Sequence, residues 1–350
     1  MNMKNMFLAA VAMLCLVSCA SETTKISGVV SDTEITDVRV TLSSAELDTL
    51  VAVVDGKFSI DVPTDEQSYG MIIMMVENQG KYGSYYIPDG YPINITVEED
   101  IVVSSEGKGP ERAYVAFVEA ANKIFETESE TQEADFVTLC CETVKANPDN
   151  AIALLALSQA VYYMTPEQKL EIVDYIQEPF KSNEFITSVM TSAKAQMDTR
   201  EGMMFTDFTV EHVYGYDRSV DPQPLKKEVK FSDYVGKGTY VLVDFWSPWC
   251  GPCRREIPNI QKVYEQYKDK GLQVLSLAVW ERKPQSHTIE TAAELGMDWL
   301  HINNCGQIPT DIYGVEGIPH LMLIGPDGTI LKRGFHGLEG IQAAVAEYIK

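Results

Sequence analysis

The stretch WCGPC at Trp249–Cys253 places two cysteines two residues apart, between an apolar predicted strand, Tyr240–Phe245, and a predicted helix that begins near Gly251. The first turn of a helix leaves backbone N–H groups without partners and carries the positive end of the helix dipole. Such a position favours a thiolate and lowers the pKa of a cysteine from about 8.5 to roughly 7 or below. We therefore expect Cys250 to be a nucleophile near neutral pH, and Cys253 to attack any mixed disulfide that Cys250 forms.

Two cysteines at this spacing also occur in structural zinc sites, which usually take four ligands. The chain has no second C-x-x-C pair, and its five histidines are scattered. The pattern therefore predicts redox chemistry, with no metal and no cofactor other than the redox-active disulfide between Cys250 and Cys253.

The net charge is strongly negative and unevenly distributed. The 350 residues carry a formal charge of −23, which argues against nucleic acid and against an anionic membrane surface as partners. From Lys230 onward there are 12 basic and 14 acidic residues, so nearly all of the excess lies before that residue. We interpret the excess as a solvated acidic surface.

Residues 1–19 have the features of a targeting segment. Lys4 precedes the uncharged apolar stretch 6–17, which is too short to span a bilayer comfortably. The stretch LVSC at 16–19 resembles the lipobox of bacterial lipoprotein signal peptides, and this resemblance implies that Cys19 is lipidated and anchors the chain to a membrane. Because Ala20 and not aspartate follows, the resemblance favours the outer membrane of a Gram-negative cell, facing the periplasm. An ordinary cleaved signal peptide is the alternative.

Exported proteins work where disulfides persist. Beyond Cys19 the chain has five cysteines, which is too few for a small fold stabilised mainly by disulfides. Because the number is odd, at least one thiol is unpaired or pairs only transiently. The core must therefore hold by apolar burial. We expect Cys140 and Cys141 to be core or near-core residues of a helix, and Cys305 to be an incidental thiol.

Two regions precede the cysteine pair. Residues 26–107 predict a small antiparallel β domain, a sandwich or barrel, because short apolar stretches, alternating at 38–42 and nearly continuous at 50–54, are separated by turn signals such as Asp55-Gly56. Residues 111–200 change to a helical period and predict a helical segment. Neither region shows a catalytic constellation. The strands expected in the β domain are 38–42, 50–54, 58–62, 71–76, 85–87 and 93–97.

Residues 203–350 alternate strands with helices and end in a hairpin and a helix, which predicts an α/β sheet covered on both faces. The strands expected are a leading strand at 205–210, then 240–245, 273–279, and a hairpin of 321–324 and 329–332. The helices expected are 251–268, 286–295 and 338–349.

This last region, about 150 of the 350 residues, resembles the thioredoxin family, specifically its TlpA/ResA-type extracytoplasmic members. The resemblance rests on VDFW at 243–246, the WCGPC stretch, Pro258, and GIP at 317–319. It implies a thioredoxin-like α/β fold. The whole chain more loosely resembles multidomain lipoproteins of Gram-negative bacteria, which place an uncharacterised β-rich domain and a helical segment before such a unit.

The resemblance implies a role for several residues. Cys250 would attack and Cys253 would resolve. Asp244 matches the buried carboxylate that relays the proton of the resolving cysteine, and burial raises the pKa of such a group into a usable range. A structural carboxylate is the alternative for Asp244. Pro319 would follow a cis peptide bond and present the backbone of Ile318 to an extended substrate.

Further positions of the family motif shape the site or dock the substrate, and here they are Trp246, Trp249, Gly251, Pro252 and Ile318. Two positions depart from the pattern. Ser276 stands where thioredoxins proper usually carry a lysine, so the charge of Asp244 loses one source of stabilisation. His320 follows Pro319, where threonine is frequent; we interpret it as a surface-turn histidine, the alternative being a group that tunes the Cys250 thiolate.

Together these features predict a lipid-anchored thiol–disulfide oxidoreductase. We expect a reductant, because the Gly-Pro dipeptide is that of thioredoxin, whose potential is about −270 mV against about −120 mV for a strong oxidant. The partners expected are exported proteins with disulfides and an extracytoplasmic electron donor.

Two other functions stay open. The first is a thiol peroxidase, since peroxiredoxins share the fold and place their attacking cysteine in a P-x-x-x-[TS]-x-x-C context. Ser247 fits the hydroxyl position of that context, but Val243 stands where the proline belongs. Cys305 would then be the resolving thiol. The second is a partner-binding lipoprotein whose redox unit is secondary.

Overall fold

A computed structural model describes residues 22–98, 100–127, 129–217 and 219–350. The predicted signal segment and Cys19 lie outside the described residues. The chain divides into two compact units. The first holds the described residues up to Tyr163 together with Tyr175–Phe180, and the second holds Met164–Asp174 and Lys181–Lys350. Among the helices in the described residues, none combines the length and the hydropathy of a membrane span.

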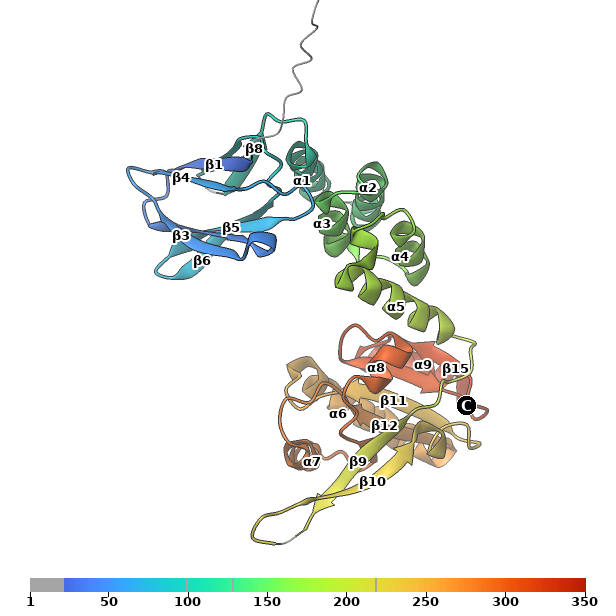
Figure 1. Ribbon diagram of the computed structural model, residues 1–350. Coiled ribbons are helices and arrows are strands. Elements are labelled where there is room, and N and C mark those ends of the chain that lie inside the picture. The colour runs from blue at the N-terminus through green and yellow to red at the C-terminus, as the bar shows by residue number, and fades with distance from the viewer. Residues whose placement is uncertain (1–21, 99, 128, 218) are drawn as a thin grey trace, which may run out of the picture. The chain divides into compact units, whose positions relative to one another are not determined.

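The first unit begins with two four-stranded sheets, which face each other in Figure 1. Their strand orders are β4-β1-β7-β8 and β3-β2-β5-β6. Alternate side chains of both sheets point inward and form one apolar core, because successive residues of a strand face opposite sides. All pairings are antiparallel except that of β1 with β7. The strands are β1 Thr23–Val30, β2 Asp37–Leu42, β3 Leu47–Ala52, β4 Lys57–Pro63, β5 Gly70–Val76, β6 Gln79–Tyr86, β7 Ile93–Val97 and β8 Ile101–Ser105.

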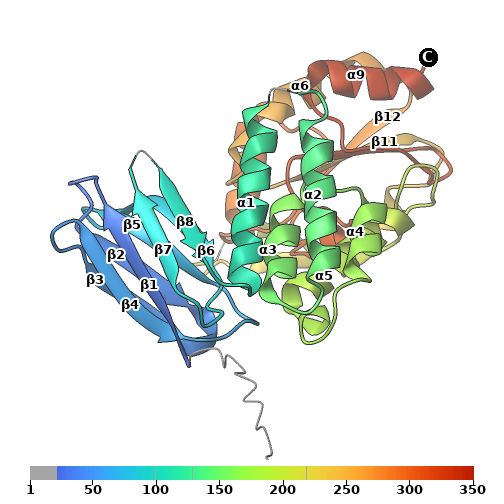
Figure 2. The ribbon, with the colours of Figure 1, turned by 90° about the horizontal axis from the view of Figure 1, so that it is seen from above.

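Helices follow the β-rich part, as the change of period predicts. Helices α1 and α2 lie side by side (Figure 2). Helix α4 begins with a capping box at Thr165 and a proline in its first turn, a favourable helix start. The helices are α1 Pro110–Glu126, α2 Gln132–Ala146, α3 Ala151–Ala160, α4 Pro166–Val173 and α5 Glu184–Asp198, with a 3-10 turn η2 at Phe180–Ser182.

The boundary between the two units runs through this helical region. Helices α1 to α3 belong to the first unit, whereas α4 and α5 belong to the second, with the α/β sheet. The sequence pattern predicts one helical segment and contains no sign of this division. The reason is that membership of a unit depends on contacts distant in sequence, which periodicity does not contain.

The second unit is built on a five-stranded sheet of order β13-β12-β11-β14-β15. The central strand β11 runs parallel to β12 and antiparallel to β14, which is the mixed sheet expected of the thioredoxin-like fold. Helices α6 and α9 pack against this sheet and can be followed in Figure 1. The elements are β9 Thr209–Tyr216, β10 Pro224–Lys230, η3 Phe231–Asp233, β11 Tyr240–Trp246, α6 Gly251–Tyr267, η4 Lys268–Lys270, β12 Leu272–Ala278, α7 Gln285–Glu294, β13 Leu300–Ile302, α8 Ile308–Tyr313, β14 His320–Ile324, β15 Ile330–Arg333 and α9 Gly337–Tyr348.

Strand β11 separates two apolar clusters. Val241, Val243 and Phe245 pack in the cluster that includes residues of β9, β10 and α8. Leu242 and Trp246 point to the other face, into the cluster formed with α6 and α9. This alternation decides on which face of the sheet each residue of the VDFW motif lies.

The prediction of a leading strand at 205–210 is wrong in its bounds. Strand β9 begins at Thr209 and forms an antiparallel hairpin with β10, seen as a long arm in Figure 1. Phe205 instead packs edge-on against Phe231, with 5.8 Å between ring centroids. Strand β13 and helix α8 are not among the expected elements, because three and six residues are too few for a periodic pattern.

Candidate active site

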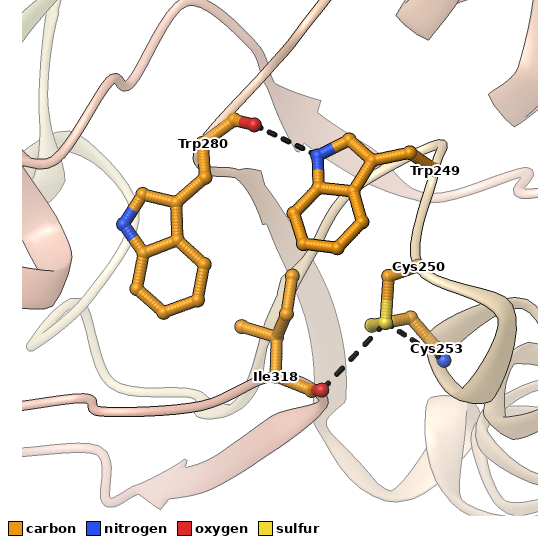
Figure 3. The surroundings of a disulfide bond; sticks show 5 residues. All are labelled: Trp249, Cys250, Cys253, Trp280 and Ile318. Atoms are coloured by element: carbon orange, nitrogen blue, oxygen red, sulfur yellow. Dashed lines mark hydrogen bonds between the residues drawn. A yellow bond between two sulfur atoms is a disulfide. The ribbon is translucent and has the colours of Figure 1, made fainter. Parts of the chain in front are cut away.

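Cys250 and Cys253 form a disulfide at the start of α6 (Figure 3). Cys250 is the N-cap residue of this helix, and its sulfur accepts a hydrogen bond from the backbone N–H of Cys253 at 3.2 Å. The side chains are 3% and 1% exposed respectively. A donor aimed at the sulfur of Cys250 stabilises negative charge on it once the disulfide is reduced. The helix-start position derived from the sequence is thus confirmed.

The loop before β14 lies against this disulfide. The Ile318–Pro319 peptide bond is cis. The carbonyl oxygen of Ile318 is 3.6 Å from the sulfur of Cys250 (Figure 3). Two segments of sequence 68 residues apart are therefore in contact at the reactive sulfur.

The two tryptophans of the motif have different positions. Trp249 is 40% exposed, and its Nε1 donates a hydrogen bond to the carbonyl of Trp280 at 2.8 Å (Figure 3). The guanidinium of Arg282 lies over the Trp249 ring, 3.7 Å from its centroid. Trp246 is fully buried in the cluster that also contains both cysteines. Gly251 and Pro252 are exposed in the first turn of α6.

Asp244 is buried on the face of β11 that α6 covers. It is 1% exposed, and β12 places Ser276 directly beside it in the parallel register. The hydroxyl of Ser276 donates to Oδ2 of Asp244 at 2.9 Å and accepts a hydrogen bond from Nε1 of Trp299 at 2.9 Å. A serine therefore does occupy the position beside Asp244, as the sequence comparison with thioredoxins predicts.

This environment changes the acidity of Asp244. Burial removes water from the carboxylate and raises the pKa to about 7, against the lowering effect of the Ser276 hydrogen bond. The negative charge of Glu256 acts in the same direction as burial. A carboxyl group with this pKa can take up and release a proton near neutral pH.

Glu256 is a residue that the sequence interpretation missed. It lies one turn after Cys253 on α6, and its Oε1 accepts a hydrogen bond from the backbone N–H of Gly337 at 2.8 Å. Because Cys253 and Glu256 are three residues apart in a helix, their side chains are neighbours on one face. This spacing could have been recognised in the sequence.

The surface-turn interpretation of His320 is wrong. His320 is the first residue of β14 and pairs with Phe245 on β11, whose ring is 5.7 Å from the imidazole between centroids. Its Nε2 atom is buried without a hydrogen-bond partner in the described structure. Burial lowers the pKa of His320 to about 3, so the side chain is neutral at physiological pH.

Helices α4 and α5 contact the same loop from within the second unit. Nζ of Lys169 on α4 donates to both carboxylate oxygens of Glu316, at 2.9 and 2.8 Å. Ser192 on α5 donates to Oε1 of the same carboxylate at 2.9 Å. Gln196 donates to the carbonyl of Gly314 at 2.7 Å. These contacts hold the segment directly before Ile318, and periodicity in sequence does not reveal them.

The other cysteines in the described part of the chain, Cys140, Cys141 and Cys305, are not part of a disulfide. Cys305 is fully buried, and burial raises the pKa of its thiol. Cys140 is buried, and burial raises its pKa to about 12; Cys141 is half-buried. Both positions on α2 agree with the core or near-core placement expected for them. Within the described ranges, no three His, Cys, Asp or Glu side chains are placed to hold a metal ion.

Comparison with known proteins agrees with this site. The AhpC/TSA family matches residues 202–333, within the second unit. The thiol-disulfide oxidoreductase ResA of Bacillus thuringiensis subsp. konkukian is 30% identical over 126 residues, which are 35% of this chain and 68% of that protein. The chain belongs to the thioredoxin-like thiol-disulfide oxidoreductase family. The resemblance that the motifs indicate is thereby confirmed.

Two further proteins to which the chain is similar are a curated relative and a solved structure. ResA of Bacillus subtilis is 30% identical over 106 residues, which are 30% of this chain and 57% of that protein. The chain thus spans little more than half the length of that relative. The thioredoxin domain of a thiol-disulfide oxidoreductase from Bacteroides vulgatus is 25% identical and covers 43% of this chain and 99% of its own, with a TM-score of 0.36.

Proposed function

We propose that this chain is an extracytoplasmic, lipid-anchored thiol–disulfide oxidoreductase that reduces disulfides of exported proteins. The observation that carries the proposal is the Cys250–Cys253 disulfide at the first turn of α6, in contact with the loop of the cis peptide bond before Pro319. Membership of the family supports the reaction class.

The reaction begins with the reduced dithiol. The thiolate of Cys250 attacks one sulfur of a substrate disulfide, forms a mixed disulfide and releases the other substrate sulfur as a thiolate. Cys253 loses its proton and attacks the sulfur of Cys250, which re-forms the intramolecular disulfide and releases the second substrate thiol. Two electrons pass to the substrate, and an extracytoplasmic dithiol donor must restore them.

Asp244 is the proposed acceptor of the proton of Cys253. Its pKa of about 7 allows the carboxylate to accept a proton in the reductive direction and to return it when the donor reduces the disulfide. Ser276 and Trp299 orient the carboxylate by a chain of two hydrogen bonds. Catalysis by such a positioned base contributes about 10²-fold or more.

The test is reduction of insulin by the dithiothreitol-reduced protein. Wild-type protein is expected to reduce insulin, Cys250→Ser to be inactive, and Cys253→Ser to accumulate a mixed disulfide that resists further turnover. Cys305→Ala serves as the matched control, because it removes a cysteine outside the disulfide. Activity that survives in Cys250→Ser would contradict the proposal.

The direction of electron flow is tested by the reduction potential of the Cys250/Cys253 pair, measured in glutathione or dithiothreitol buffers. A reductant is expected near the thioredoxin value of about −270 mV. A value tens of millivolts above the glutathione range would make the protein an oxidant or isomerase instead.

The membrane anchor rests on the sequence of the N-terminus, which lies outside the described residues. Lipidation of Cys19 predicts that the protein made in a Gram-negative host partitions into the detergent phase of Triton X-114 and labels with palmitate. Cys19→Ala is expected to lose both properties. Unchanged partition of that variant would contradict the anchor and favour a cleaved signal peptide.

A thiol peroxidase is the second candidate, because the AhpC/TSA match lies within the second unit and includes Cys250. Two observations weaken it. Val243 occupies the position of the peroxidase proline, and Cys305 is fully buried, so it is poorly placed to resolve a sulfenic acid on Cys250. Rapid consumption of hydrogen peroxide by the reduced protein would favour this candidate over disulfide reduction.

A further inference from the structure

A pocket of about 370 Å³ lies beside the disulfide, between the first turn of α6 and the segment that joins β12 to α7. Its lining includes Trp249, Gly251 and Thr288, and its walls are mostly apolar. Trp249 and Gly251 are the two chain neighbours of Cys250, so the pocket adjoins the turn that carries the reactive cysteine. The proposed reaction assigns no role to this pocket.

Basic side chains surround this pocket. Arg254, Arg282 and Lys283 line it and are exposed to solvent. Arg282 is held in place over the Trp249 ring at 3.7 Å. This local excess of positive charge contrasts with the formal charge of −23 of the chain. Substrate anions therefore meet an attractive field at the disulfide and a repulsive one from the chain as a whole.

The acidic side chain that lines the pocket is engaged internally. Glu281 is half-buried and accepts hydrogen bonds from the hydroxyl of Thr288, at 2.5 Å, and from the backbone N–H of Asn304, at 2.6 Å. Burial raises its pKa, which weakens its ability to neutralise the nearby cations. Within the part of the chain that the structure describes, Arg254 and Lys283 form no ion pair, so their positive charges are available to a ligand.

We propose that this pocket is a specificity subsite that binds an acidic segment of the substrate polypeptide. An apolar side chain near the substrate half-cystine enters the pocket. The carboxylates that flank it pair with Arg254, Arg282 and Lys283. The inference rests on the proposed reductase function and names its substrate class. The apolar side chain gains by leaving water, and the carboxylates gain by long-range attraction and by charge-assisted hydrogen bonds to guanidinium groups. A lysine-rich segment would be repelled at the same place.

Two disulfide-linked peptide dimers test this subsite. They are identical, with leucine beside the cysteine, except that two flanking residues are aspartate in one and lysine in the other. The reduced wild-type protein is expected to cleave the acidic dimer with a kcat/KM about tenfold or more above that of the basic dimer at low salt. The ratio should fall towards one at about 0.5 M NaCl, where the Debye length is only ~4 Å. Replacing the leucine by serine should lower kcat/KM for the acidic dimer by about tenfold.

Charge-reversal variants assign the preference to the pocket. Arg254→Glu/Lys283→Glu is expected to lose or invert the ratio between the two dimers. Lys237→Glu/Lys262→Glu is the matched control, because it changes the net charge equally at exposed positions outside the pocket and is expected to keep the ratio. The ratio is the readout because a charge near Cys250 also alters the thiolate itself and hence the rate with every substrate.

The outcomes separate the subsite from the reaction. Equal kcat/KM for the two dimers in wild-type protein, or an unchanged ratio in Arg254→Glu/Lys283→Glu, would overturn the subsite while leaving the reductase in place. The neutral compound bis(2-hydroxyethyl) disulfide monitors the reaction itself. Failure to reduce this compound and both dimers would overturn the proposed function and the subsite with it.

Discussion

Lys169 on α4 and Glu316, three residues before the cis-proline, form an ion pair with an Nζ–Oε2 distance of 2.8 Å. The lysine side chain is 2% exposed and the glutamate side chain 32% exposed. A helix that precedes the α/β sheet by many residues in sequence therefore supports the loop that contacts Cys250. Ser192 adds a hydrogen bond to the same carboxylate, so α5 takes part as well.

Breaking this pair should destabilise the second unit. Lys169→Met leaves Glu316 without its cation, and since the carboxylate is partly exposed we expect a loss of about 1–3 kcal/mol of unfolding free energy. A displaced loop should also raise KM for insulin. Urea unfolding followed by tryptophan fluorescence measures the first effect, because all four tryptophans lie in the second unit.

The double variant Lys169→Met/Glu316→Leu is the control for this pair. Replacing both charges by apolar side chains removes the unpaired carboxylate, so most of the lost stability should return. Additive losses from the two single substitutions would mean that the ion pair contributes no coupling energy.

Asp244→Asn tests the proton relay. The pKa of Asp244 is about 7 in the folded protein, whereas the ordinary value for aspartate is 3.8. The side chain is therefore mostly ionised, and able to act as a base, only above about pH 7. We expect the variant to reduce insulin about 100-fold more slowly at pH 8 and to lose the rise of kcat through pH 7. Iodoacetamide alkylation of reduced Cys250 gives the thiolate pKa separately. An unchanged profile would assign Asp244 a purely structural role.

The same shift has a consequence for stability. A carboxyl group whose pKa is raised by folding binds its proton more tightly in the folded state, so stability is full below pH 3.8 and declines as the pH rises through 7. Asp244→Asn has no such ionisation. We expect its unfolding free energy to depend less on pH than that of wild type between pH 4 and 7, measured by urea titration.

Two neighbours should move the pKa of Asp244 in opposite directions. Ser276→Ala removes a hydrogen bond that favours the carboxylate, so the pKa should rise and about 1 kcal/mol of stability should be lost at pH 8. Glu256→Gln removes a negative charge and keeps the acceptor for Gly337, so the pKa should fall. Carbon-13 NMR of the aspartate carboxyl groups measures both shifts. Shifts of the same sign would contradict this account.

A buried carboxyl in the first unit predicts a separate pH dependence. Glu111 is fully buried, its Oε2 accepts a hydrogen bond from the N–H of Ile87 at 2.6 Å, and burial raises its pKa from 4.5 to about 8. Stability from this group is therefore complete below pH 4.5 and is lost as the pH rises to 8, at no more than about 1.4 kcal/mol per pH unit.

Glu111→Gln should remove that dependence, because an amide cannot ionise. Hydrogen exchange of peptides that cover residues 80–115 reports on the first unit directly. We expect wild-type protection in these peptides to weaken between pH 5 and 8 after correction for intrinsic exchange, and protection in the variant to stay constant. Equal weakening in both proteins would place the titrating group elsewhere.

Part of the fold and of the site was predictable from local pattern. Alternation over 38–42 corresponds to β2, and the apolar stretches 71–76 and 240–245 correspond to β5 and β11. The position of Cys250 at a helix start followed from the strand-to-helix change around the motif. These features depend on neighbours in sequence, which is why periodicity and motif spacing contain them.

Other features depended on contacts between distant residues. The sequence predicts a turn at His320 because the residue follows Gly317–Pro319. Pairing of β14 with β11 instead places it half-buried beside Phe245. The hairpin arm was missed because β10 carries several charged residues and lacks the apolar alternation of a buried strand.

The sequence alone determined the chemistry of this protein, since a cysteine pair at the start of a helix defines a redox dithiol through local backbone donors and the helix dipole. The surroundings of that dithiol, in contrast, are set by contacts between distant segments. The Lys169–Glu316 pair, the proximity of Ile318 to Cys250, and the basic pocket beside Trp249 join segments far apart in the chain. These three features depend on long-range packing, and no local pattern in the sequence specifies them.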